Sequence, residues 1–239
     1  MPGLYRDAGV VLRTIKLGEA DRIVTLATAS HGKVRAVAKG VRKTKSRFGS
    51  RLEPISHVDV LLYAGRELDV VTSTESIDHF KAVRDDLDRL TRATALLEAV
   101  DAVIQEGEKD PRIYQMLVGA LRTLAAGEAP LIVPAFYWKL LAQQGVGPVL
   151  DRCASCGTNG PLVAFDLGEG GTLCRACRRG VPISPEALGL LRRILGGDLL
   201  AVLAEGPSPD GWEVEALATA ALEHHLERRL RAVHILDHH

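Results

Sequence analysis

The hydrophobic pattern of this chain changes its period once, near residue 80, and that change limits the folds open to it. Before residue 80, apolar residues alternate with polar ones, as they do along half-buried β-strands. From Phe80 onward they recur every three or four residues, as they do on one face of a helix. The sequence therefore predicts an α+β protein with a strand-rich N-terminal part and a helical remainder.

The N-terminal part contains five strand-like segments within about eighty residues. Gly32 suits a tight turn before the third segment, and Gly65-Arg66 suits a hairpin between the last two. The predicted strands are residues 8–14, 21–28, 33–39, 56–64 and 67–75. This count fits the OB-fold, a small five-stranded barrel that binds oligonucleotides. We expect an OB-fold domain over residues 1–79 and a helical domain over residues 80–239.

The helical part shows clear start signals. Asp110 followed by Pro111, and Ser184 followed by Pro185, each read as an N-cap with proline at the first helical position. The predicted helices are residues 80–104, 110–126, 131–144, a helix opening at Pro185, and a last helix over residues 211–236. The apolar seam expected along the last helix is Leu222, Leu226, Leu230 and Val233.

An inserted segment at about residues 150–180 carries all four cysteines of the chain. Cys153 and Cys156 form one CxxC pair, Cys174 and Cys177 form another, and seventeen residues separate the pairs. Two such pairs supply the four thiolates of a tetrahedral Zn²⁺ site, and two disulfides are the alternative. Four thiolates leave no open position for water, so we expect one structural zinc ion in a zinc finger. Gly157 suits a tight first knuckle, whereas Arg178 rather than glycine follows the second pair.

Charge is distributed unevenly, although 30 basic and 30 acidic residues balance over the whole chain. Residues 1–51 carry 12 Lys/Arg and 3 Asp/Glu, a net of +9, whereas residues 52–130 carry 8 and 15, a net of −7. Residues 33–51 hold eight basic side chains and no acidic one. A basic N-terminal region followed by an acidic region predicts a polyanionic partner. Basic residues on a small barrel and its loop suit contacts to a nucleic-acid backbone.

The sequence offers no set of catalytic groups. Phosphate-loop, dinucleotide-binding, zinc-protease and serine-hydrolase motifs are absent, and we expect no enzymatic activity. Asp85, Asp86 and Asp88 read as a solvated acidic face. No apolar stretch approaches the roughly 20 residues that cross a bilayer, and the N-terminus does not resemble a signal peptide, so we expect a cytoplasmic protein.

Two alternatives to DNA binding stay open from the residues alone. The basic loop can belong to an adaptor that docks on an acidic protein partner, and metal bound by three sulfurs and water would indicate a zinc enzyme. For base stacking on DNA, the aromatic candidates are Phe48 and Tyr63, each of which can equally be a core residue.

The N-terminal run resembles the RecO family of bacterial DNA repair proteins. The resemblance is densest in residues 9–54, through "VVLRT", "GEADRIVTL", "HGK", "AVAKG" and a basic segment that ends at "LEP". The paired cysteines inside a helical domain also fit many members. The family has an N-terminal OB-fold, a helical C-terminal domain and a zinc finger.

The resemblance implies a recombination mediator that binds single- and double-stranded DNA and anneals complementary strands. Members work with RecR, often with RecF, and help to load the RecA recombinase onto DNA coated with single-strand binding protein (SSB). It also implies association with the nucleoid. Carried over to this sequence, the zinc ligands are Cys153, Cys156, Cys174 and Cys177. The implied DNA-binding residues are Lys33, Arg35, Lys39, Arg42, Lys43, Lys45, Arg47 and Arg51, with Arg13, Lys16 and Arg22 as further candidates.

Overall fold

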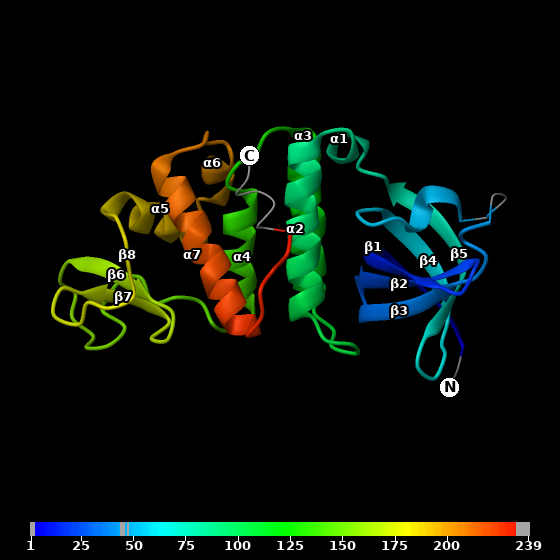
Figure 1. Cartoon of the computed structure of the whole chain (residues 1–239), viewed down its shortest axis with the longest axis horizontal. Coiled ribbons are helices and arrows are strands. Elements are labelled where there is room, and N and C mark those ends of the chain that lie inside the picture. The colour runs from blue at the N-terminus through cyan, green and yellow to red at the C-terminus, as the bar shows by residue number, and fades with distance from the viewer. Residues whose placement is uncertain (1–2, 44–45, 47, 233–239) are drawn as a thin grey trace. The chain divides into compact units, whose positions relative to one another are not determined.

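The computed structural model describes residues 3–43, 46 and 48–232. It confirms the predicted α+β class, with a closed five-stranded barrel followed by a helical region (Figure 1). The chain forms two compact units that divide between Gly127 and Glu128, and each unit is described by itself. The expected domain boundary at residues 79 and 80 stays a prediction, because compactness and independent folding are different properties. No helix among the described residues combines the length and apolar character needed to span a membrane.

The barrel closes in the strand order β1-β2-β3-β5-β4, with β3 and β5 parallel and the other pairs antiparallel. Its strands are β1 (Leu4–Leu17), β2 (Asp21–Thr28), β3 (Gly32–Ala38), β4 (His57–Tyr63) and β5 (Asp69–Asp78). The inward side chains are mostly Val, Leu and Ala, and a short 3-10 helix, η1 (Gly49–Leu52), adds Leu52 to this core. The alternation seen in the sequence is therefore the inside-outside alternation of a barrel.

Strand β1 is much longer than the predicted 8–14. Its first half, Leu4–Val10, pairs with β4, and its second half, Gly9–Leu17, pairs with β2. A bulge lies between Val11 and Arg13. Because β1 uses different halves to pair with β4 and with β2, it must be long for this barrel to close. Local alternation recognised only its middle.

The predicted single helix over residues 80–104 is wrong, because the chain breaks after one turn. Helix α1 (Lys81–Arg84) follows Phe80, and α2 (Leu87–Val103) begins anew after Asp86. Asp86 is extended and its carboxylate accepts the backbone N–H of Arg89, so it acts as an N-cap. Leu87, the first residue of α2, is 68% exposed.

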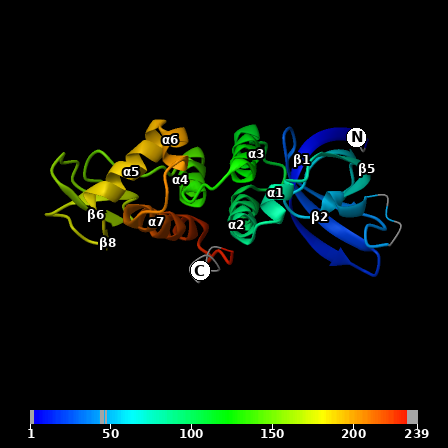
Figure 2. The same ribbon diagram turned by 90° about the horizontal axis from the view of Figure 1, so that it is seen from above.

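Helix α3 (Pro111–Ala126) follows with the predicted Asp110 cap. Together with α2 it covers the outer face of β1 at the Arg13 end, while α3 also reaches β2 (Figure 2).

The second unit is built from helices around a small sheet. Helices α4 (Ile132–Gln143), α5 (Pro185–Gly196), α6 (Leu199–Leu203) and α7 (Pro209–Leu226) make the helical part. Helix α4 is apolar on most of its surface and packs against α5 and α7. The sheet has the order β7-β6-β8, from β6 (Leu162–Asp166), β7 (Gly171–Cys174) and β8 (Val181–Pro182).

The predicted extent of the last helix is wrong at its C-terminal end. Helix α7 stops at Leu226, and Glu227 takes a left-handed conformation. The backbone N–H of Leu230 then donates to the Glu223 carboxylate at 2.7 Å. This turn folds Leu230 back into a buried position without a helical seam. Val233, the last residue of the predicted seam, lies outside the described residues.

Candidate metal centre and nucleic-acid interface

The four cysteines come together at one point of the second unit. Their sulfur atoms all lie within 4.8 Å of one another, and Cys156 Sγ lies 3.8 Å from Cys174 Sγ. Sulfurs about 2.3 Å from a central ion in a tetrahedron are about 3.8 Å apart, whereas a disulfide needs about 2.05 Å. All four cysteines are free. The cluster therefore has the donor set and the spacing for one tetrahedral metal ion.

Two backbone turns hold the cysteines in place, and we call residues 149–183 the cysteine module. In the first knuckle, the N–H of Gly157 donates to the Cys153 carbonyl at 2.9 Å, and Gly157 has a φ of +75°. This confirms the tight turn expected there. The second pair lacks a glycine directly after Cys177, yet Cys177 still reaches the cluster.

The protein environment shifts the pKa values of two of these thiols in opposite directions. Backbone N–H groups, first that of Cys174 and then those of Cys156 and Ser155, lower the pKa of the Cys153 thiol to about 6. Cys177 lies beside the other sulfurs, first Cys156, and its pKa is raised to about 12. Four adjacent thiolates repel one another, and a divalent cation at their centre removes that repulsion and releases the remaining protons. The site is therefore chemically suited to a metal ion.

The predicted DNA-binding residues separate into two groups. The first group gathers where β1 turns into β2 and where β3 ends. The N–H of Arg42 donates to the Ala20 carbonyl at 2.9 Å, and its guanidinium donates to the Gly18 carbonyl at 3.2 Å. These bonds bring the segment after β3 onto the β1–β2 turn. The exposed cations at this end are Lys16, Lys39, Arg42 and Lys43, and we call them the basic rim.

The second group forms ion pairs with acids of α2 and of the segment that follows it. Arg13 and Lys33 both pair with Asp101 on α2, at 2.6 and 2.7 Å. The Lys33 ammonium also donates to the backbone carbonyl of Asp101 at 2.6 Å, and its side chain is only 13% exposed. Arg35 pairs with Glu106 at 3.2 Å. These three cations therefore share two carboxylates within the unit, and Lys33 is the most enclosed of them.

The other residues predicted to contact DNA differ in burial and in ion pairing. Arg22 pairs with Glu53 at 2.6 Å, and Arg51 is half-buried in η1. Lys45 and Arg47 lie outside the described residues. Of the two aromatic candidates, Phe48 is buried in the barrel core, whereas Tyr63 is 45% exposed.

Sequence reasoning missed the acidic partners Asp101 and Glu106. They lie about seventy to ninety residues from the cations that they neutralise, and no local pattern connects such distant positions. The basic run was visible in the sequence, but its division into a neutralised group and a solvent-facing group was not.

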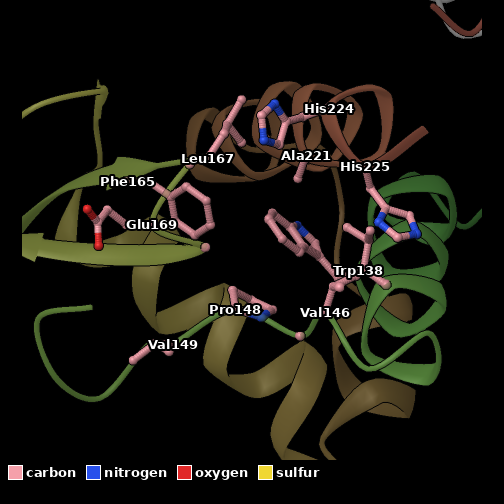
Figure 3. Close-up of a pocket in the computed structure, with 14 residues that line it drawn as sticks. Trp138, Val146, Pro148, Val149, Phe165, Leu167, Glu169, Ala221, His224 and His225 are labelled. Carbon is pink, nitrogen blue, oxygen red and sulfur yellow. The ribbon is translucent and has the colours of Figure 1, made fainter. Parts of the chain in front are cut away.

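The second unit also contains a cavity of about 500 Å³ beside the cysteine module. Figure 3 shows Trp138 from α4 and Phe165 from β6 at its centre, with His224 and His225 on the α7 side. Trp138 and Phe165 meet edge to face, with ring centroids 5.6 Å apart. The lining is mostly apolar, and none of its residues is a serine, threonine or cysteine that a histidine would activate.

Comparison with known proteins covers almost the whole chain. Residues 1–80 match the family described as "Recombination protein O N terminal", and residues 84–234 match "Recombination protein O C terminal". A protein of Streptomyces coelicolor is 47% identical over 98% of this chain and 99% of its own length. Proteins of Thermobifida fusca and Frankia casuarinae are 44% and 45% identical over 98% of each chain. All three carry the name "DNA repair protein RecO".

Proposed function

This chain belongs to the RecO family of DNA repair proteins, and we propose that it acts there as a non-enzymatic mediator of homologous recombination. In this role it binds single- and double-stranded DNA and anneals complementary strands. With RecR, and with RecF where that protein takes part, it helps to load RecA onto SSB-coated DNA. Such work takes place at the nucleoid, in the cytoplasm.

The observation that carries this proposal is the basic rim. Its four exposed cations form no ion pair within the described part of the chain, so their charge is available to phosphates. They lie at one end of a barrel of the type that binds oligonucleotides. Glu19 and Asp21 are the nearby acids, and Asp21 is engaged by the N–H of Gly40 at 2.7 Å. The surface is therefore predominantly cationic.

Annealing needs no catalytic residue. Two complementary strands repel each other through their phosphates, and a dense cationic surface reduces that repulsion while releasing counterions. No covalent bond forms or breaks. A surface of lysines and arginines without a nucleophile or general base is sufficient for this task.

The metal has a structural part in this account. The core cluster around the cysteines consists of Cys153, Ala164, Leu173 and Cys174. So small an apolar core does not stabilise a three-stranded sheet, and Zn²⁺ held by the four thiolates supplies the missing stabilisation. Four sulfur ligands would leave the metal no position for a water molecule, which argues against hydrolytic chemistry.

Annealing of two complementary oligonucleotides, with and without SSB, tests the proposal. The rim variant Lys16→Ala, Lys39→Ala, Arg42→Ala, Lys43→Ala should anneal at least about tenfold more slowly than the wild type. The matched control Lys109→Ala, Arg112→Ala, Arg228→Ala, Arg229→Ala removes the same charge from exposed positions elsewhere and should keep its activity.

Failure of the wild type to bind or anneal DNA would contradict the proposal. It would favour the adaptor alternative, in which the basic rim docks on an acidic protein. Cobalt substitution tests the metal centre separately. A tetrahedral four-sulfur spectrum supports a structural ion, whereas three sulfurs and water would support a zinc enzyme.

A further inference from the structure

The four cysteines of the metal centre differ in their access to solvent. Cys153 and Cys174 are buried, with exposed fractions of 1% and 6%, and Cys177 is half-buried. Cys156 is exposed, and so are all the residues from 155 to 159 around it. A Cβ placed on Gly157, the next residue, would meet no described atom within 4 Å. One of the four cysteines is therefore open to small molecules in solution, while the others are more shielded.

A second thiol lies next to the exposed one. Cys156 Sγ is 3.8 Å from the Sγ of Cys174, which ends strand β7. A disulfide bond is about 2.05 Å long, so two sulfurs this close can form one after a small movement. Cys153, in the same knuckle as Cys156, is a poorer partner. Three backbone N–H groups hold its sulfur, and a thiolate stabilised in this way attacks less readily.

We propose that Cys156 is a site of oxidation by hydrogen peroxide and that Cys174 completes the reaction as its disulfide partner. This inference rests on the proposed metal centre, whose ligands are thiolates, the reactive form of cysteine. It goes beyond the structural role of that centre, because it makes the binding of the metal depend on the oxidation of the chain. An exposed thiolate beside a second thiolate is the arrangement typical of redox-sensing cysteines.

The chemistry needs one molecule of hydrogen peroxide and no other reagent. The Cys156 thiolate attacks one peroxide oxygen, the O–O bond breaks, and the products are a sulfenic acid and hydroxide. The Cys174 thiolate then attacks the Cys156 sulfur, the S–O bond breaks, and a second hydroxide leaves as the disulfide forms. Two electrons pass from the two sulfurs to the peroxide. The thiolates of Cys153 and Cys177 remain, which are too few for a tetrahedral site.

Loss of the metal should unfold the cysteine module, because little else stabilises it. The buried cluster around the cysteines consists of two of the ligands, Ala164 and Leu173. The binding free energy of a structural metal ion is folding free energy, so its release and the unfolding of the module should occur together. The barrel core contains no cysteine and should keep its fold. The effect of the oxidant is therefore confined to the module.

The test uses the full chain purified with Zn²⁺ and then treated with hydrogen peroxide. A colorimetric zinc dye measures the released metal, and mass spectrometry of peptides maps the disulfides. The reactive-site variant is Cys156→His, and its matched control is Cys177→His. Histidine is a common zinc ligand, so both variants keep four protein ligands. Zinc content and thermal melting before oxidation verify that both are folded. Disulfide mapping of the wild type decides the question if either variant fails to hold zinc.

We expect the wild type to release zinc and to form the Cys156–Cys174 disulfide in equal amounts. Cys156→His should release zinc at least about tenfold more slowly, because the exposed thiolate is gone. Cys177→His should release it at the wild-type rate. Dithiothreitol and added Zn²⁺ should restore the metal centre, because a disulfide is reducible whereas sulfinic acid is not.

Equal slowing of zinc release by the two variants would overturn the inference, because exposure would then not select the sulfur that reacts. A first disulfide between Cys153 and Cys156, or one without Cys156, would overturn the assigned pair. Zinc release that dithiothreitol cannot reverse would show that the product is not a disulfide. If the purified chain holds no metal, the proposed metal centre itself fails. A zinc-loaded chain that peroxide leaves unchanged is a different result, in which only this inference fails.

Discussion

The barrel and the cysteine module are both small sheets, and they are stabilised in opposite ways. The barrel encloses twelve buried core residues drawn from all five strands and from the segment around η1. The module has a described core cluster of four residues, two of which are cysteines. The barrel therefore keeps its fold by apolar burial, whereas on our proposal the module depends on a metal ion held by its cysteines.

Within the barrel, the basic residues of one sequence run also have two different surroundings. At the helix-facing side of the barrel, cations neutralise the acids of α2 and the segment after it and so stabilise the unit. At the basic rim, cations meet solvent. The predictions below separate metal-dependent from core-dependent stability first, and then separate the two groups of cations.

Removal of the metal should give the largest effect. Structural zinc in small finger peptides contributes on the order of 10 kcal/mol to folding, so a chelator should unfold the cysteine module. The amide signals of residues 149–183 should collapse in NMR spectra, while barrel signals persist. Affinity for DNA should change little. Loss of barrel signals together with those of the module would show that the two sheets are not stabilised separately.

Replacement of Asp101 by alanine should be the most damaging single change at the helix-facing side. It leaves Lys33 with little solvent access and without its carboxylate partner, at a cost of about 3 kcal/mol in the free energy of unfolding. Urea denaturation measures this loss. The control Asp59→Ala breaks the exposed pair with Arg6 and should cost much less, because solvent screens that pair. A similar cost for both variants would contradict the stabilising role of Asp101.

Two lysines of the same run should respond differently to the same change. Lys39→Met removes one rim cation, so the log–log salt slope of single-strand binding should become shallower by about 0.7. Lys33→Met should leave that slope unchanged, because its charge is already paired with Asp101. Fluorescence anisotropy at several salt concentrations measures both. Equal changes in slope would show that the internal pairing does not decide which cations meet DNA.

The smallest expected effect is a pH dependence at His57. Burial, followed by the charge of Arg122, lowers the pKa of His57, while Asp78 acts in the opposite direction. Its Nε2 lies 2.7 Å from the Tyr114 hydroxyl of α3. Below about pH 6.5 the unfolded chain therefore binds a proton that the folded protein resists, and stability falls with falling pH.

His57→Gln should flatten this part of the stability profile between pH 7.5 and 5.5. The difference from the wild type cannot exceed about 1.4 kcal/mol for each pH unit that separates the folded and unfolded pKa values. Urea denaturation at each pH measures it. Parallel profiles for the two proteins would show that His57 does not titrate differently in the folded state.

Much of this architecture could be predicted from local pattern. Alternation located five strands, the Asp110 and Ser184 caps located two helix starts, and the cysteine spacing predicted that the four cysteines lie together. Each of these signals operates over a few residues or within one motif. Predictions from these signals were correct because local conformational preference and the overall fold agree at these positions.

The parts that could not be predicted depend on contacts between distant residues. The full length of β1 follows from barrel closure, and the neutralisation of Lys33 follows from the approach of α2. The register that closes the five strands into a barrel is likewise not supplied by hydrophobic alternation. The end of α7 depends on the contact between Glu223 and the Leu230 backbone.

The central claim is that the barrel binds DNA through the basic rim, and the salt dependence of binding tests it most directly. Anisotropy of a single-stranded oligonucleotide should be measured for the wild type, the fourfold rim variant and the fourfold control variant. The rim variant should give a log–log slope shallower by about 2.8, which corresponds to four lost phosphate contacts, while the control keeps the wild-type slope. Equal slopes for the wild type and a folded rim variant would contradict the account and place the DNA elsewhere on the protein.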